Sequence, residues 1–245
     1  MAITLSATHA TVIFDASTGN TSSITNNGTP TGVAGTPGSL TYTGATDGFN
    51  NAGFASTDNI NTLIGGAGLT DADTVTITLN VSSITGGALR SQGVLFGMSG
   101  DTSTILGGAN SMLIQMEGGN IGSDILIGAN SFQDAGDTGL QNFNSAILNG
   151  FTATLTADKD GYEFSLTGVH TTSPHIVTGT FSGTEFVDNF GTGHFYYTAQ
   201  KFNQATALTT NITEASIDVT TVPEPSGVTI LGLCGVGLLL RRRNR

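Results

Sequence analysis

Tryptophan is absent from this sequence, cysteine occurs once, and only seven of its 245 residues are lysine or arginine. Because Cys234 is alone, the chain can form no internal disulfide, and the sequence before it has no thiol for catalysis. Charged residues make up 10% of the chain, against about a quarter in an ordinary globular protein. The sequence therefore depends on hydroxyl and amide side chains, more than on charge, for its solubility.

The few basic residues are unevenly distributed. Four of the seven lie between positions 241 and 245, which leaves Arg90, Lys159 and Lys201 for the rest of the chain. Of the 18 acidic residues only Glu224 follows position 222, so residues 1–222 hold three basic and 17 acidic side chains, a net charge of −14. A body this acidic repels phosphate backbones, which excludes nucleic-acid binding as its function.

Apolar residues recur in short runs separated by turn residues, which favours a folded β protein over a disordered chain. The clearest run is 74–81, where Val75, Ile77, Leu79 and Val81 alternate with polar residues. Such alternation predicts an antiparallel strand with one buried and one solvated face.

Residues 151–166 predict a β-hairpin. Two alternating runs flank Asp158-Lys159-Asp160-Gly161, and Asp-Gly is a strong hairpin signal because glycine accepts a positive φ. Pairing Ala157 with Tyr162 places every apolar side chain of the hairpin on one face. The other apolar pairs in this register are Leu155 with Phe164 and Ala153 with Leu166.

The remaining segments complete an all-β pattern. Short strands are predicted at 11–14, 40–43, 94–98, 112–116, 125–127, 177–181, 195–197 and 212–219. Loops are predicted at 17–39, 49–68 (with room for one irregular strand) and 186–193, and short helical turns at 142–148 and 202–208. Ten or more short strands without a long helical period predict one domain, residues 1–220, folded as a two-layer antiparallel β-sandwich of the jelly-roll type. Its first and last strands are expected to pair or to lie side by side.

Motifs for catalysis are missing. A sandwich glucanase needs two carboxylates close together, and no Glu-x-Asp-x-x-Glu pattern occurs. Glu163 falls on the polar face of its hairpin, where solvation is the expected role. His9, His170, His175 and His194 show no metal-ligand spacing, so no enzymatic activity and no metal cofactor are predicted. A hydrolase with carboxylates drawn from distant strands stays an alternative.

Two weaker patterns suggest ligand binding. Asp71 with Asp73, and Asp134 with Asp137, are candidates for a structural calcium site in loops; the alternative is that they accept local backbone hydrogen bonds in turns. Exposed aromatic rings beside amides are typical of sugar sites, and the chain offers these residue types at Asn189, Phe190, Tyr196 and Tyr197. The competing interpretation is that aromatic residues in a strand belong to the core.

The end of the sequence has a composition of its own. Residues 221–227 hold Val222-Pro223-Glu224-Pro225, a spacer that cannot be helical because proline fixes its own φ and favours extended geometry in the residue before it. Residues 228–245 comprise an uncharged apolar run, predicted as a short helix, and then an arginine cluster that prefers a cytoplasmic membrane face. Thirteen helical residues reach roughly 20 Å of a bilayer core of about 30 Å, so a buried core helix is the alternative.

This order of parts resembles the PEP-CTERM sorting signal of bacterial exported proteins. The resemblance implies that Pro223, Glu224 and Pro225 are the tripeptide recognised by an exosortase, a membrane enzyme that processes such tails. It implies that Arg241, Arg242 and Arg243 are the stop that holds the tail transiently in the inner membrane, and that the protein goes to the cell envelope, the outer surface or the extracellular matrix. It also implies an amino-terminal secretion signal, but Met1–Ser6 show no basic n-region and no apolar run of the required length.

The body of the chain resembles the concanavalin-like (laminin-G-like) sandwiches of lectins and glucanases, in its length and in the hairpin Asp-Gly-Tyr-Glu-Phe-Ser-Leu at 160–166. Three functions follow as hypotheses. The first is an exported surface or matrix protein with no catalysis of its own. The second is a lectin-like module that binds an extracellular polysaccharide, and the third is the glycoside hydrolase mentioned above.

Overall fold

The structure is a computed structural model, and it describes residues 9–16, 21–26, 34–36, 39–42, 49–66, 68–85, 89–100, 112–116, 123–127, 130–133, 147–148, 150–168, 172–202 and 208–221. Thr221, the first residue of the predicted spacer, is the last residue of a strand, whereas the rest of the spacer, the sorting tripeptide, the apolar helix and the arginine cluster lie outside these residues. Within the described part, no helix is both long and apolar enough to cross a membrane.

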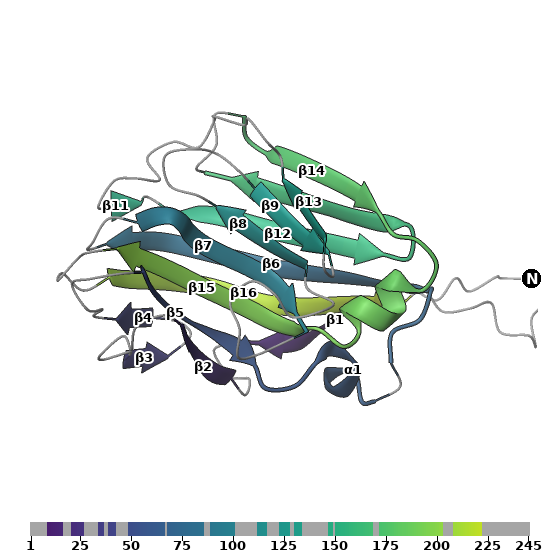
Figure 1. Cartoon of the computed structure of the whole chain (residues 1–245). Helices are drawn as coiled ribbons and strands as arrows, with labels where there is room; N and C mark the ends of the chain where they lie inside the picture. The colour runs from purple at the N-terminus through teal and green to yellow at the C-terminus, as the bar shows by residue number, and fades with distance from the viewer. Residues whose placement is uncertain are drawn as a thin grey trace, which may run out of the picture.

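Two antiparallel sheets form the two layers of a β-sandwich (Figure 1). The strands of the nine-stranded sheet run in the order β14 (His175–Thr180), β13 (Gly161–Thr167), β12 (Phe151–Asp158), β6 (Asp73–Thr85), β16 (Leu208–Thr221), β4 (Ser39–Tyr42) and β3 (Ala34–Thr36); β1 (His9–Asp15) pairs with β16, and β11 (Ile147–Leu148) with β6. The strands of the seven-stranded sheet run in the order β10 (Asn130–Gln133), β9 (Ser123–Ile127), β8 (Met112–Met116), β7 (Leu89–Ser99), β15 (His194–Phe202), β5 (Phe49–Ser56) and β2 (Thr21–Asn26). The all-β jelly-roll sandwich predicted from the sequence is confirmed.

The central strand β6 shows why this sequence folds as a sandwich. Its buried residues alternate with partly exposed ones from Asp73 to Val81, as the apolar period of two predicted. The predicted hairpin is also confirmed in its register, because Ala157 pairs with Tyr162 and Leu155 with Phe164. Gly161 closes the turn at a point where a side chain would start only 2.1 Å from the carbonyl oxygen of Gly179.

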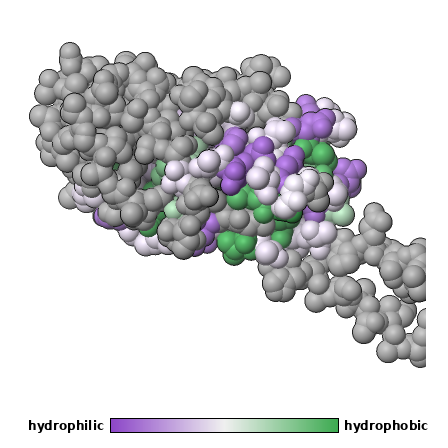
Figure 2. All heavy atoms as spheres, turned by 90° about the horizontal axis from the view of Figure 1, so that it is seen from below, coloured by the Kyte–Doolittle hydropathy of each residue, from purple (hydrophilic) through white to green (hydrophobic). Residues whose placement is uncertain are grey.

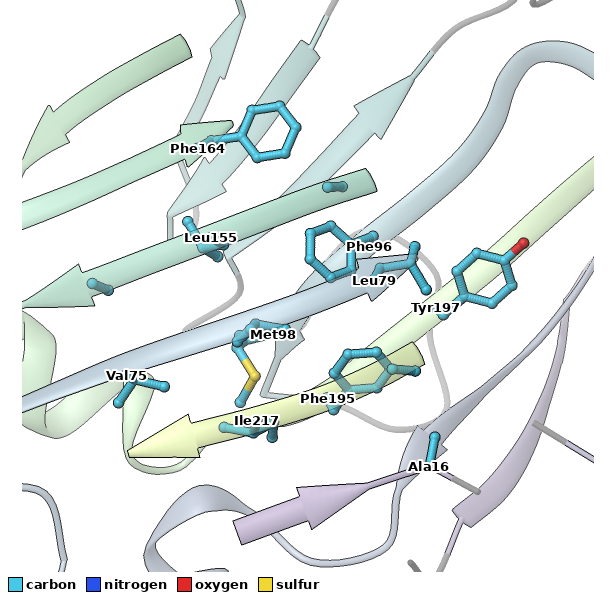
Figure 3. Close-up of a cluster of buried hydrophobic side chains, with 14 of the residues drawn as sticks. Ala16, Val75, Leu79, Phe96, Met98, Leu155, Phe164, Phe195, Tyr197 and Ile217 are labelled. Carbon is cyan, nitrogen blue, oxygen red and sulfur yellow. The ribbon is translucent and has the colours of Figure 1, made fainter. Parts of the chain in front are cut away.

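Strands from the two ends of the chain meet in one sheet, as the sequence predicted. β1 pairs antiparallel with β16, and β16 itself lies beside β6 along nearly its whole length. The core fills the space between the sheets (Figure 3): Leu79, Leu155, Phe164 and Ile217 come from the nine-stranded sheet, and Phe96, Met98, Phe195 and Tyr197 from the seven-stranded one. Rings stack within this core, with the centroids of Phe54 and Phe195 5.8 Å apart.

Several local predictions were wrong. Residues 147–148 are strand β11 instead of a helical turn, because they pair with the last two residues of the long β6. The helical turn predicted at 202–208 is wrong at both ends, because residue 202 is the last of β15 and residue 208 is the first of β16. Residues 203–207 are not among the described residues. The predicted loop at 17–39 contains β2 and β3, and the one at 186–193 contains the π-helix η1 (Phe186–Phe190). The one strand allowed for in 49–68 is β5, and it is followed by the helix α1 (Ile60–Leu63), which was not predicted. Pairing with neighbouring strands, which local propensity does not encode, decides these strands.

Candidate functional site

The aromatic residues proposed for sugar binding belong to the core. Tyr196 and Tyr197 are completely buried, and Phe190 is 2% exposed. Phe190 packs against Phe186, with ring centroids 5.9 Å apart. Asn189 lies in η1, but its side chain is outside the description. Because a sugar ring stacks only on an exposed face, the interpretation of these rings as a binding surface is wrong, and the core interpretation holds.

The first aspartate pair does not act as a unit. The Asp73 carboxylate is buried and accepts three hydrogen bonds: from the backbone N–H of Thr70 at 2.8 Å, from the Thr70 hydroxyl at 2.8 Å and from the Thr221 hydroxyl at 2.6 Å. Asp71 is exposed. Asp73 is thus a turn residue that also secures the end of β16. Asp134 and Asp137 fall outside the description, and the described residues contain no group of three or more His, Cys, Asp or Glu side chains that would hold a metal.

The other titratable residues weighed from the sequence lie apart. Glu163 is exposed on the outer face of the nine-stranded sheet, opposite Thr156, as the hairpin pattern predicted. His175 begins the edge strand β14, and His9 begins β1 at the other side of the sheet. His170 is outside the description. His194 begins β15 and lies beside Ser56, at the end of β5.

The polar residues around His194 are organised by Ser56, the last residue of β5. The Ser56 hydroxyl donates to the backbone carbonyl of Asp58 at 2.8 Å and accepts from the backbone N–H of Phe195 at 2.9 Å. The carbonyl of Ser56 lies 3.0 Å from Nδ1 of His194. One buried serine thereby fixes both the loop that carries Asp58 and the strand that carries His194. We call Ser56, Asp58 and His194 the Ser56 cluster.

The bond to Ser56 determines which nitrogen of His194 carries the proton. A carbonyl oxygen can only accept, so Nδ1 of His194 must donate, and in the neutral ring Nε2 is then an unprotonated acceptor. Neither Nε2 of His194 nor the carboxylate of Asp58 has a hydrogen-bond partner among the residues that the structure describes. Both side chains are half-buried. The cluster thus offers two polar groups with unused hydrogen-bonding capacity.

The surroundings of the cluster are rigid. The N–H of Ile60 donates to the carbonyl of Gly193, and that of Asn61 to the carbonyl of Gly191, so α1 is bound to the segment between η1 and β15. The side chain of Asn59 caps α1 by accepting from Thr62. At Gly191 a Cβ would lie 2.5 Å from Oδ1 of Asn61, so only glycine allows this approach. The coils of α1 and η1 lie at the same end of the sandwich (Figure 1).

Sequence reasoning missed this site. Ser56 and Asp58 fell in a stretch predicted as mostly loop, and His194 is 138 residues further on. No spacing rule joins positions so distant, because the antiparallel pairing of β5 with β15 brings them together. The available signal was the cluster of Ser, Asp and Asn directly after an apolar run, which is typical of a strand end.

No family model and no curated protein sequence matches the chain. Among solved structures, a lectin from Bauhinia forficata in complex with GalNAc superposes with a TM-score of 0.50 at 8% identity, over 89% of this chain and 100% of the lectin. The Ca²⁺-bound exoplasmic/lumenal domain of VIP36 superposes with a TM-score of 0.50 at 9% identity, over 88% of this chain and 91% of that one. At these identities the similarity shows the fold alone: this chain has a lectin-like jelly-roll sandwich.

Proposed function

We propose that the chain is an exported, lectin-like protein that binds carbohydrate at the Ser56 cluster and has no catalysis of its own. The fold supports this proposal, because the Bauhinia forficata lectin, which has the same architecture over the whole of its length, is described in complex with GalNAc. The cluster contributes the chemistry. The carboxylate of Asp58 and Nε2 of His194, whose ring is oriented by its bond to Ser56, can accept hydrogen bonds from sugar hydroxyl groups.

The negative charge of the protein limits the kinds of glycan that it can bind. With a net charge of −14 over residues 1–222, the body of the protein repels polysaccharides rich in carboxylate or sulfate. The Asp58 carboxylate repels the same groups at short range. Neutral or amine-bearing glycans are therefore the expected ligands. Calcium is a candidate cofactor because the VIP36 domain is described as Ca²⁺-bound.

A glycan array tests the proposal. The purified chain is applied in calcium and again in chelator, and we expect binding to neutral glycans that Asp58→Asn and His194→Ala each reduce at least tenfold. Asp160→Asn is the matched control, because that carboxylate lies on the exposed β12–β13 turn, next to Lys159. Absence of binding in both buffers, or equal binding by all variants, would refute the assigned site. The same glycans should release no reducing sugar on long incubation.

Export is proposed on the sequence of the tail. The Val222-Pro223-Glu224-Pro225 spacer, the apolar run and the arginines have the order of a sorting signal, and β16 ends at Thr221, directly before them. Replacing Pro223, Glu224 and Pro225 by alanine should leave uncleaved protein in the inner membrane. Mass spectrometry of protein from fractionated cells measures this, and normal surface delivery of the variant would disprove the role of the tripeptide.

A further inference from the structure

The outer face of the nine-stranded sheet carries a regular set of threonines. On β6 and β12, buried residues alternate with half-buried ones. Leu79 of β6 and Leu155 of β12 lie in the core between the sheets (Figure 3), so the half-buried residues next to them in each strand lie on the opposite, outer face. Six of these outer residues are threonines, which we call the threonine array: Thr74, Thr76, Thr78, Thr152, Thr154 and Thr156.

Strand pairing sets these threonines in register. β6 and β12 are antiparallel neighbours, with Thr156 opposite Thr76 and Thr154 opposite Thr78. The other two threonines extend the array by one residue on each strand. Because threonine is β-branched, its χ1 angle is restricted, and residues in the same strand conformation hold their hydroxyl and methyl groups alike. The array is therefore a small two-dimensional lattice.

The hydroxyl groups of the array are available to a partner. None of the six forms a hydrogen bond with another of the described residues. The array contains no charged side chain, whereas the described surface in view in Figure 2 mixes strongly hydrophobic with strongly hydrophilic residues. An uncharged array with regular spacings is complementary to a partner that is itself uncharged and periodic.

The spacings of the array are close to those of crystalline water. Residues two apart on a strand are separated by about 6.8 Å, and neighbouring strands by about 4.8 Å. In ice each oxygen has four tetrahedral neighbours at an O···O distance of about 2.75 Å, so the lattice repeats every ~7.3 Å along its hexagonal axis and every ~4.5 Å at right angles to it. Three threonines on a strand span two repeats, over which the mismatch amounts to about 1 Å.

We infer that the threonine array binds ice. A hydroxyl group both donates and accepts hydrogen bonds, so each threonine takes the place of a water molecule at the crystal surface. Both matching repeats lie in the prism faces of ice, which contain the hexagonal axis. On the basal face the longer repeat is ~7.8 Å, which about doubles the mismatch along the strand. The array should therefore adsorb to prism faces.

The neighbouring strands limit the contact to β6 and β12. Glu163 of β13 lies opposite Thr156, and Asp218 of β16 lies opposite Thr76, so carboxylates that favour liquid water border the array on both sides. Two strands are also the width that suits a flat lattice, because each further strand adds a rotation of about 20–25°. A flat neutral polysaccharide fits less well, since the outward-facing residues of β6 and β12 include no aromatic ring for a sugar to stack on.

Ice growth in a solution of the full chain, in mild detergent, tests the inference. We expect a gap between the melting and the freezing point (thermal hysteresis) that detergent alone does not produce. Thr78→Lys should reduce this gap at least twofold, because a long charged side chain in the array holds the ice surface away. Thr178→Lys is the matched control, since it places the same side chain on the same face but on β14, three strands from β6. Circular dichroism checks that both variants are folded. A wild-type chain without hysteresis, or equal losses in the two variants, would overturn the inference.

The crystal face to which the protein adsorbs provides a second readout. Cys234 is the one cysteine of the sequence, so a fluorescent maleimide labels the chain outside residues 1–222 without any substitution. Labelled protein should adsorb to the prism faces of a growing single crystal of ice. Adsorption to the basal face alone, or retention by insoluble cellulose with no adsorption to ice, would contradict the inference. The outcome is independent of the Ser56 cluster, because Asp58→Asn and His194→Ala should leave adsorption to ice unchanged.

Discussion

Removing the hydroxyl of Tyr197 should stabilise the protein. Tyr197 is completely buried between the sheets, and Thr210 of β16 is 1% exposed. The Thr210 side chain is close enough to influence the phenol, yet neither hydroxyl has a partner at normal hydrogen-bond geometry among the described residues. A buried polar group without a partner costs about 1–3 kcal/mol. Tyr197→Phe keeps the ring and removes this cost, so the free energy of unfolding should rise by about 1 kcal/mol.

Urea denaturation followed by far-UV circular dichroism measures the effect, because a chain without tryptophan gives no indole signal. Tyr162→Phe is the control, since Tyr162 retains 6% exposure and should change the stability little. A double-mutant cycle with Thr210→Val isolates the coupling between the two hydroxyls. If Tyr197→Phe lowered the free energy of unfolding by 1 kcal/mol or more, the hydroxyl would have a favourable partner and the reasoning would be refuted.

The pH dependence gives an independent check. Burial raises the pKa of the Tyr197 phenol above its ordinary value of about 10, and the Thr210 side chain opposes this only partly. The folded state therefore holds the phenol proton more tightly than the unfolded state does. This contribution to the free energy of unfolding is complete below pH 10 and is lost as the pH rises further. The wild type should therefore lose stability faster than Tyr197→Phe above about pH 10.

Two further substitutions test the packing of the sheet edge and the end of β16. Gly179→Val should lower the free energy of unfolding by about 2 kcal/mol, because a Cβ there would lie 2.2 Å from the ring of Tyr162. The same substitution in a Tyr162→Ala background should cost less if the clash with the ring is the cause. Equal losses in the two backgrounds would contradict this. Asp73→Ala should cost about 2–4 kcal/mol in urea denaturation, since it leaves Thr70 and Thr221 without their acceptor; a change below about 0.5 kcal/mol would show that this carboxylate is not needed.

Most of the fold prediction rested on the alternation of apolar and polar residues. The alternation in 74–81 and the Asp-Gly turn at 160–161 are local signals, and each specifies which side chains share a face. The predicted registers of the hairpin followed from them without knowledge of the other strands. Positions 21–26 and 34–36 gave no such signal, because glycine, threonine and serine there form strands only by pairing with β5 and β4.

The candidate site could not be found in this way. Aromatic residues suggested a surface at Tyr196 and Tyr197, but adjacent residues of a strand point to opposite faces, and both faces of β15 are buried at this point. Ser56 and His194 meet only through the pairing of distant strands. The π-helix η1 also escaped prediction, although Phe186 and Phe190 bury their rings in one aromatic group with Phe181.

The position of β16 has a consequence for the order of events during synthesis. This strand contacts β1, β4 and β6 within one sheet, yet it is made after all of them. Until residue 221 has emerged, β6 lacks its neighbour and the sandwich has a gap near its middle. The larger sheet of a chain synthesised from its amino terminus therefore cannot be completed until nearly all of the domain has been translated.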